Sequence, residues 1–169
     1  MTSLEILNTQ DQATFTDTLS GIFEHSPWIP ETTHASAPFD TWEALYQALC
    51  ATVDTSAESL QMELILAHPD LAGKLAVSNQ LTEHSTDEQQ SARLDQLSPE
   101  RFEAIQKMNS DYKAKFSFPF IICVKDHTQD SIFENFAARL ENNIPKEREA
   151  ALTQIKRIAW HRLQATVGA

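Results

Sequence analysis

The sequence has little glycine, little cysteine and few basic residues. It contains three glycines and two cysteines in 169 residues, and 24 acidic against 13 basic side chains give it a formal net charge of −11. Three scattered glycines exclude the glycine-rich loops that bind nucleotide phosphates. The acidic balance argues against nucleic acid and anionic membrane surfaces as partners, because both require clustered lysine and arginine. An anionic ligand therefore needs a local positive pocket.

Disulfides and membrane spans are also not expected. Cys50 and Cys123 are far apart in the sequence and form no CxxC pair, so no disulfide framework is indicated. The longest apolar run, Phe118 to Val124, is too short to cross a bilayer, and the N-terminus lacks the basic and apolar regions of a signal peptide. We therefore expect a protein of the reducing cytoplasm, with residues 1–169 forming a single domain.

Aliphatic residues recur mostly at intervals of three and four, which predicts an all-α fold, a bundle of about seven to eight helices. Cap and proline signals predict where the helices begin: near Asn8 or Thr9, at Asp40 to Glu43, near Ser56, at Ser98-Pro99, near Thr128 and near Pro145. The stripes predicted to face the core include Trp42, Leu45, Tyr46, Leu49 and Val53, and later Phe102, Ile105, Asn109, Tyr112 and Phe116.

Two stretches are predicted to be non-helical. Pro27, Pro30 and Pro38 indicate an irregular connection. Residues 117–124 have high β-propensity but no evident partner strand, so we expect one buried extended segment there. Its backbone groups require hydrogen-bond partners, and a polar ligand is one way to supply them.

His68 is the first candidate for chemistry. An apolar helical run, Leu64 to Ala67, reaches His68, and Pro69 disfavours a helical conformation at the residue before it. The imidazole is thus expected at a helix end, and a histidine held there is well placed to transfer protons. The alternative is that His68 only caps free carbonyls or interacts with the helix dipole.

Glu88 is the second candidate, in the stretch Ser85-Thr86-Asp87-Glu88. This spacing has the form of a capping box, in which the Glu88 carboxylate bonds back to the backbone. His84 and Glu88 also stand four residues apart, as two metal ligands on one helix face would. Two ligands do not complete a site, so we expect no bound metal.

Arg162 is the third candidate. The spacing of Leu152, Ile155, Ala159 and Arg162 places a guanidinium in line with the apolar face of the last helix. A cation in that position either forms a structural salt bridge or binds an anionic ligand. The pattern alone leaves both possibilities open.

Five blocks of the sequence resemble the signature blocks of one family. They are Phe23-Glu24-His25-Ser26-Pro27-Trp28, His68-Pro69-Asp70-Leu71-Ala72-Gly73, Ser85-x-x-Glu88-Gln89, Asn109-x-x-Tyr112-x-x-Lys115-Phe116-x-Phe118-Pro119-Phe120-Ile121 and Ile158-x-x-x-Arg162-Leu163. Together they are similar to the 2-oxo-4-hydroxy-4-carboxy-5-ureidoimidazoline (OHCU) decarboxylases, in order and over nearly the whole chain. Arg93 and Ser117 stand where that family usually has glycine.

The resemblance implies an all-α carboxy-lyase that uses no cofactor, forms a homodimer and converts OHCU to (S)-allantoin in the last step of urate breakdown. Carried over position by position, the catalytic residues would be His68, Glu88 and Arg162. The residues implied in substrate binding are Pro69, Gln89, Phe118, Phe120, Ile121 and Ile122.

Two other functions remain open from the residues alone. An acidic helical interaction module would use its polar residues structurally and the stretch Pro27 to Pro38 for docking. A lyase or hydrolase of a related ureide or purine intermediate would use the same three side chains. The first alternative predicts no saturable binding of a small ureido-imidazoline.

Overall fold

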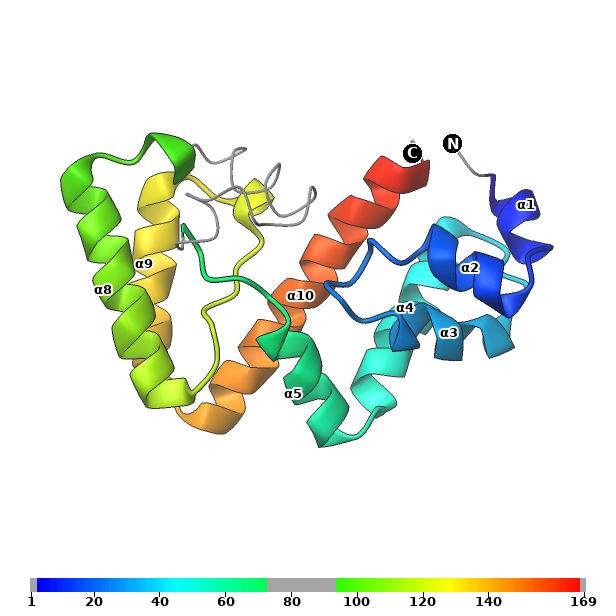
Figure 1. Ribbon diagram of the computed structural model, residues 1–169, viewed down its shortest axis with the longest axis horizontal. Coiled ribbons are helices and arrows are strands. Elements are labelled where there is room, and N and C mark those ends of the chain that lie inside the picture. Colours follow the sequence, from blue (N-terminus) through cyan, green and yellow to red (C-terminus); the bar gives the residue numbers. More distant parts are fainter. Residues whose placement is uncertain (1–2, 73–93, 168–169) are drawn as a thin grey trace. The chain divides into compact units, whose positions relative to one another are not determined.

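The computed structural model describes residues 3–72 and 94–167. These residues form eight α-helices and three short 3-10 helices, with no strand among them, which confirms the all-α prediction (Figure 1). The α-helices are α1 (Leu4–Asn8), α2 (Gln12–Thr18), α3 (Trp28–Thr33), α4 (Trp42–Thr55), α5 (Glu58–Leu66), α8 (Pro99–Phe116), α9 (Gln129–Leu140) and α10 (Ile144–Val167). Within the described ranges, no helix is both long and apolar enough to cross a membrane.

The chain divides into two compact units. Unit 1 comprises residues 1–67 and 156–169, and unit 2 comprises residues 68–155. Helix α10 contributes its first half to unit 2 and its second half to unit 1.

Unit 1 is built around one face of α4. Leu45, Leu49 and Val53 lie three or four residues apart and are completely buried, as their helical spacing predicts. Helix α3 packs against both α2 and α4. Trp42 and Tyr46 of the predicted stripe are only half-buried, because they lie at the edge of this face.

The helix starts in unit 1 differ from two predictions. Asp11, not Asn8 or Thr9, caps α2 by accepting a hydrogen bond from the Thr14 amide at 2.8 Å. Asn8 instead ends a separate short helix, α1. The Asp40 to Glu43 capping box is also off by one residue, since the cap of α4 is the Thr41 hydroxyl.

The proline-rich stretch is partly helical, which corrects the prediction of an irregular connection. Pro27 is the N-cap of α3, the helix begins at Trp28, and Pro30 lies in its first turn. Proline is tolerated there because the first amides of a helix have no partner inside the helix. A second short helix, His34–Ser36, follows.

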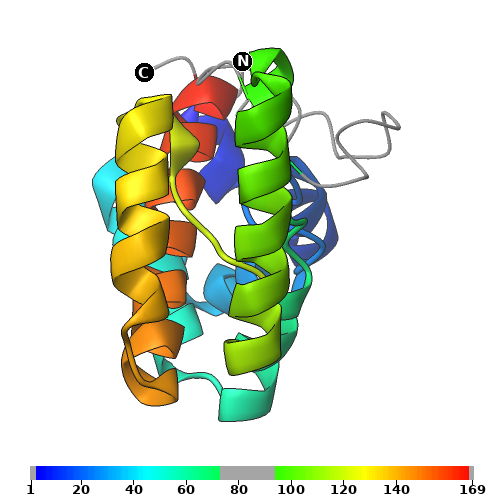
Figure 2. The ribbon, with the colours of Figure 1, turned by 90° about the vertical axis from the view of Figure 1, so that its left-hand side faces the viewer.

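Unit 2 contains two parallel helices, α8 and α9, with the extended segment between them: Arg101 near the start of α8 bonds Gln129 and Asp130 at the start of α9, and Lys115 near the end of α8 bonds Leu140 at the end of α9. Helices α8 and α9 lie side by side, and Figure 2 shows the chain after α8 passing between them. The rings of Phe120 and Phe136 are stacked with centroids 3.8 Å apart, and Tyr112 packs edge-on against both. These aromatic side chains form the core of the unit.

The caps of α8 and α9 follow the sequence closely. The Ser98 hydroxyl accepts from the Arg101 amide with Pro99 in the first turn, and Thr128 caps α9 in a reciprocal capping box with Ser131. Ile105, Asn109, Tyr112 and Phe116 of the predicted stripe are buried. Phe102 is exposed, because the apolar face of α8 begins one turn later than predicted.

Candidate active site

His68 lies directly after a helix that ends before a proline, as predicted. Helix α5 ends at Leu66 with Ala67 as its C-cap, and His68 is the first residue of unit 2. Its side chain is 8% exposed although imidazole is a polar group. Pro69 is half-buried. A buried histidine on a short irregular stretch is a group that can hold or move a proton away from bulk water.

The turn that follows His68 is bound by one face of α8. Asn109 Nδ2 donates to the Leu71 carbonyl oxygen at 2.8 Å, and the next residue of the turn, Ala72, accepts from Gln106 Nε2 at 2.6 Å. Ala72 has a φ of 47°, in the left-handed region that favours glycine. Contacts with α8 therefore hold this turn in a conformation that alanine does not prefer.

Arg162 lies on the buried face of the C-terminal half of α10, in unit 1. Its Nη1 is 2.9 Å from Glu24 Oε2, and the two side chains are 3% and 2% exposed. The same nitrogen donates to the Gly21 carbonyl oxygen at 3.4 Å. Arg162 is therefore part of a buried ion pair, one of the two possibilities that the sequence left open.

Glu24 was not among the predicted site residues, although it lies in one of the five signature blocks. Its backbone is shaped by a tight turn, in which the Ser26 hydroxyl donates to the Glu24 carbonyl oxygen at 2.9 Å and His25 has a φ of 45°. No periodicity connects residue 24 to residue 162. The signature block Phe23 to Trp28 was the only feature of the sequence that pointed to a functional role for this turn.

The predicted extended segment ends one residue early, because Val124 begins the 3-10 helix Val124–Asp126. Its residues Phe118 to Cys123 belong to no helix or strand and are buried throughout, as predicted. The segment begins after Ser117, the C-cap of α8, whose φ of 65° is left-handed. The glycine that the family resemblance leads us to expect at this position is therefore explained by backbone conformation. The four predicted substrate-binding residues in this segment are 1–4% exposed: Phe118, Phe120, Ile121 and Ile122.

A buried polar network fixes the middle of this segment. Glu147, on the first half of α10, is completely buried and accepts hydrogen bonds from Arg139 Nε at 2.7 Å and from the Tyr112 hydroxyl. The Arg139 guanidinium also donates to the Ile121 carbonyl oxygen and stacks over the Phe120 ring, 4.4 Å from its centre. Sequence reasoning missed this network because its members come from three different helices.

Burial and the hydrogen bond to Glu147 raise the pKa of Tyr112. Desolvation disfavours the phenolate, and the neighbouring carboxylate opposes a second negative charge. Tyr112 is thus a hydrogen-bond donor at neutral pH. This role is structural, since the network supports the backbone of residues 120 and 121.

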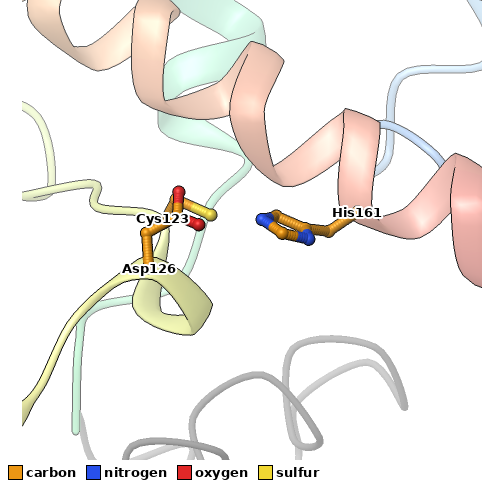
Figure 3. A group of neighbouring side chains, drawn as sticks. All are labelled: Cys123, Asp126 and His161. Atoms are coloured by element: carbon orange, nitrogen blue, oxygen red, sulfur yellow. The ribbon is translucent and has the colours of Figure 1, made fainter.

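Cys123 and Asp126 end this stretch of unit 2, and Figure 3 shows their side chains. The Cys123 thiol and an Asp126 carboxylate oxygen lie within 4.8 Å of each other, and the Cys123 amide donates to Gln154 Oε1 at 2.9 Å. Figure 3 also draws His161, which belongs to the unit 1 half of α10. A thiol and a carboxylate alone are fewer ligands than a zinc site uses.

Unit 1 has a surface hollow of about 290 Å³ between α4 and α10. The rings of Tyr46 and Trp160 lie 4.9 Å apart in its wall, and the Tyr46 hydroxyl donates to the Lys156 carbonyl oxygen at 3.0 Å. No predicted site residue lines it. The lining residues are Glu43, Tyr46, Gln47, Arg157, Trp160 and His161.

Several predictions lie outside the described residues. These are the catalytic Glu88, the substrate-binding Gln89, the alternative metal ligand His84, the Ser85 cap and the glycine replacement Arg93. Of the remaining predicted residues, His68, Pro69 and the four extended-segment residues belong to unit 2, and Arg162 belongs to unit 1.

Comparisons with known proteins give one consistent result. The model of the OHCU decarboxylase family matches residues 8–164. The 2-oxo-4-hydroxy-4-carboxy-5-ureidoimidazoline decarboxylase of Halalkalicoccus jeotgali is 36% identical over 96% of this chain and 90% of its own length. The uric acid degradation bifunctional protein PucL of Bacillus subtilis is 38% identical over 96% of this chain and 32% of its own.

A solved structure agrees with these relationships. The crystal structure of (S)-allantoin synthase superposes with a TM-score of 0.79 at 26% identity and covers 98% of this chain and 54% of that one. The match extends over both units, including the blocks around Glu24, His68, Asn109 and Arg162. The chain belongs to the OHCU decarboxylase family, a family of carboxy-lyases.

Proposed function

We propose that this protein converts OHCU to (S)-allantoin by decarboxylation, as a step of urate degradation that requires no metal and no organic cofactor. The observation that carries the proposal is the 36% identity, over 96% of the chain, to a protein named for this decarboxylation. The buried His68 and the buried Arg162 supply the proton-transferring and cationic groups that the reaction needs.

The substrate contains its own electron sink. In OHCU the carbon that bears the carboxylate also bears a hydroxyl, and its neighbour belongs to a C=N bond. When the bond to the carboxylate breaks and carbon dioxide leaves, the electron pair forms a double bond to the neighbouring carbon and the nitrogen of the C=N bond takes up a proton, which gives an enol. A proton then adds to the ureido-bearing carbon as the enol hydroxyl gives up its proton and becomes a carbonyl. The enzyme must shield the carboxylate from water, manage the hydroxyl proton and select the face that is protonated.

We assign these tasks to the predicted residues. His68 takes and returns the hydroxyl proton as a buried general acid–base group. Arg162 anchors the anionic substrate by charge-assisted hydrogen bonds while Glu24 keeps its guanidinium oriented. Glu88 orients the histidine or accepts from the ureido N–H groups. Pro69 and Gln89 shape the pocket.

The extended segment has a separate role. Phe118, Phe120, Ile121 and Ile122 provide an apolar wall and backbone hydrogen-bonding groups that hold one face of the substrate. Support for this comes from their burial and from the Glu147–Arg139 network, which keeps the backbone of this segment in place. A rigid wall is what selective protonation of one face requires.

The organisation of the protein is also a proposal. We infer one functional domain formed by both units, because the family match from residue 8 to residue 164 extends through both. Cys50 and Cys123 are buried and not disulfide-bonded, which is in keeping with a reducing cytoplasm. A homodimer is expected from the family resemblance, and light scattering coupled to size-exclusion chromatography measures it directly.

Circular dichroism during urate oxidation tests the activity. OHCU is generated in place by the two preceding enzymes, and this protein is added or withheld. We expect a rapid rise of optically active allantoin only when it is present. Slow formation of racemic product at the same rate in both samples would contradict the proposal and favour the interaction module. Turnover of a different ureide alone would favour the related lyase or hydrolase.

A further inference from the structure

One face of α8 binds three successive residues of the turn that follows His68. Gln106, Asn109 and Lys113 are three and four residues apart, so their side chains share a face of the helix. They contact the turn in reverse order: Gln106 Nε2 donates to the Ala72 carbonyl oxygen at 2.6 Å, Asn109 Nδ2 donates to the Leu71 carbonyl oxygen at 2.8 Å, and Lys113 Nζ is 2.6 Å from Asp70 Oδ2. The turn therefore runs antiparallel to α8 and is held at every residue.

The central contact is the most deeply buried of the three. Asn109 is 4% exposed and Leu71 is 5% exposed, and a buried carbonyl that loses its partner costs the full desolvation penalty. The Lys113–Asp70 pair is much more exposed, with side chains 47% and 31% accessible, and such surface pairs contribute little. Asn109 thus decides where the turn lies.

The position of the turn determines the position of His68. Only Pro69 separates His68 from Asp70, and the proline ring fixes φ near −65°. Asn109 holds the Leu71 carbonyl, and only Pro69 and Asp70 lie between Leu71 and His68. Few backbone torsions can therefore change the position of the imidazole relative to Leu71. The left-handed φ of Ala72 shows that the turn is not a relaxed conformation of its own, so contacts from α8 are needed to maintain it.

Stability alone does not explain an asparagine at position 109. The residue interrupts the apolar stripe of α8, and its Oδ1 is buried with no hydrogen-bond partner among the described residues. An unsatisfied buried carbonyl oxygen is destabilising, and an apolar side chain would avoid that penalty, but it would leave the buried Leu71 carbonyl without its donor. What Asn109 provides and an apolar side chain does not is the bond from its Nδ2 to Leu71.

We propose that Asn109 is a positioning residue for the reaction: by holding the Leu71 carbonyl it places the His68 imidazole for proton transfer. The inference rests on the proposed function, and specifically on His68 as the proton-transferring group. Asn109 touches neither the substrate nor the imidazole in this account. Gln106 and Lys113 assist by holding the residues on either side of Leu71.

The first test compares two matched asparagines. Asn109→Leu removes the bond to Leu71. Asn8→Leu removes a bond of the same kind in unit 1, from Asn8 Nδ2 to the Phe39 carbonyl oxygen at 2.8 Å, together with the one that Asn8 Oδ1 accepts from the Phe39 amide at 2.9 Å. We expect Asn109→Leu to lower kcat about ten- to a hundredfold, because small displacements of a catalytic group cost that much. Asn8→Leu should lower Tm and leave kcat unchanged. Wild-type kcat in folded Asn109→Leu would overturn the proposal.

The second test asks whether Asn109 acts through His68. In a His68→Asn background there is no imidazole to place, so Asn109→Leu should cause no further loss of rate or of enantiomeric excess. A merely structural role would lower the rate by the same factor in both backgrounds, and that result would also overturn the proposal. The measurement is single-turnover circular dichroism on OHCU generated in place.

Two outcomes separate this inference from the function on which it rests. If His68→Asn retains wild-type kcat, the role assigned to His68 is wrong. If His68→Asn is inactive and Asn109→Leu is unaffected, only the positioning role fails. Should Asn109→Leu not fold, Asn109→Ser decides, because its shorter side chain keeps a polar group but cannot reach the Leu71 carbonyl: a lowered kcat that disappears in the His68→Asn background supports the proposal, and wild-type kcat refutes it.

Discussion

Arg162 and Glu24 form a buried ion pair, with Arg162 Nη1 2.9 Å from Glu24 Oε2. Both side chains are almost completely removed from water, so each charge depends on the other for compensation. The pair joins the last helix of unit 1 to the turn after α2. The pair also holds the guanidinium of Arg162, the proposed anion-binding group, in one orientation.

Removing the carboxylate of this pair should therefore affect both stability and substrate binding. Glu24→Gln leaves a buried guanidinium without a counter-charge, and we expect the free energy of unfolding to fall by about 3–5 kcal/mol, measured by urea denaturation. The Michaelis constant for OHCU should rise because Arg162 loses its orientation. Asp54→Asn is the matched control, since Asp54 pairs with Lys156 at 2.8 Å on the surface and should cost no more than about 1 kcal/mol. Equal losses in the two variants would contradict this account of the buried pair.

His68→Asn should keep the fold and lose most turnover. The substitution retains a polar side chain of similar shape but removes the proposed general acid–base group, and loss of general acid–base catalysis costs about a hundred- to ten-thousandfold in rate. Far-ultraviolet circular dichroism checks the fold, and the optical activity of the allantoin formed checks the reaction. Wild-type activity in this variant would remove His68 from the mechanism.

Ser117→Gly should stabilise the protein. Ser117 ends α8 at a φ of 65°, and the left-handed conformation costs a residue with a Cβ about 1–2 kcal/mol, part of which glycine gives back as entropy in the unfolded chain. We expect a net gain of about 1 kcal/mol, seen as a rise in Tm of about 2–4 °C. Ser110→Gly, at an exposed position inside α8, should instead lower Tm. A fall in Tm for both variants would contradict the role of backbone conformation at position 117.

Both tyrosines of the chain should resist ionisation in the folded protein. Burial raises the pKa of Tyr46 and of Tyr112 above the ordinary value of 10.0. Above pH 10 the unfolded chain loses phenol protons that the folded chain keeps, so the free energy of unfolding should fall as the pH rises. Urea denaturation between about pH 9 and about pH 11 measures this, with tyrosinate absorbance as the second readout. Tyrosinate absorption in the native protein at about pH 10 would contradict this expectation. As a control, replacing both tyrosines with phenylalanine should weaken the pH dependence of the free energy of unfolding.

The helices and their boundaries in unit 2 were predictable from local sequence. Ser98-Pro99 begins α8 and Thr128 caps α9, because capping depends on residues only three positions apart. The end of α5 before Pro69 follows from the geometry of proline. The buried extended segment after α8 was also predictable, since it combines β-propensity with the absence of a partner strand.

Local sequence was less informative where two signals compete. Pro30 indicated a break, yet it lies in the first turn of α3, where a missing amide does no harm. Phe102 fits the spacing of the buried stripe of α8 but is exposed. Whether a position on a helix face is buried depends on which other elements pack against it. Ser117 stands where the family resemblance leads us to expect glycine. Only its observed left-handed φ showed why glycine suits this position.

Sequence by itself determined the all-α class, most helix starts and the candidates His68 and Arg162, because each of these depends on residues within a few positions of one another. Only the tertiary structure decided which charges meet. Glu24 and Arg162 are separated by most of the chain, and the bond from Asn109 to Leu71 joins residues 38 positions apart. Such pairings are set by which elements pack together, and no periodicity within either element encodes its partner.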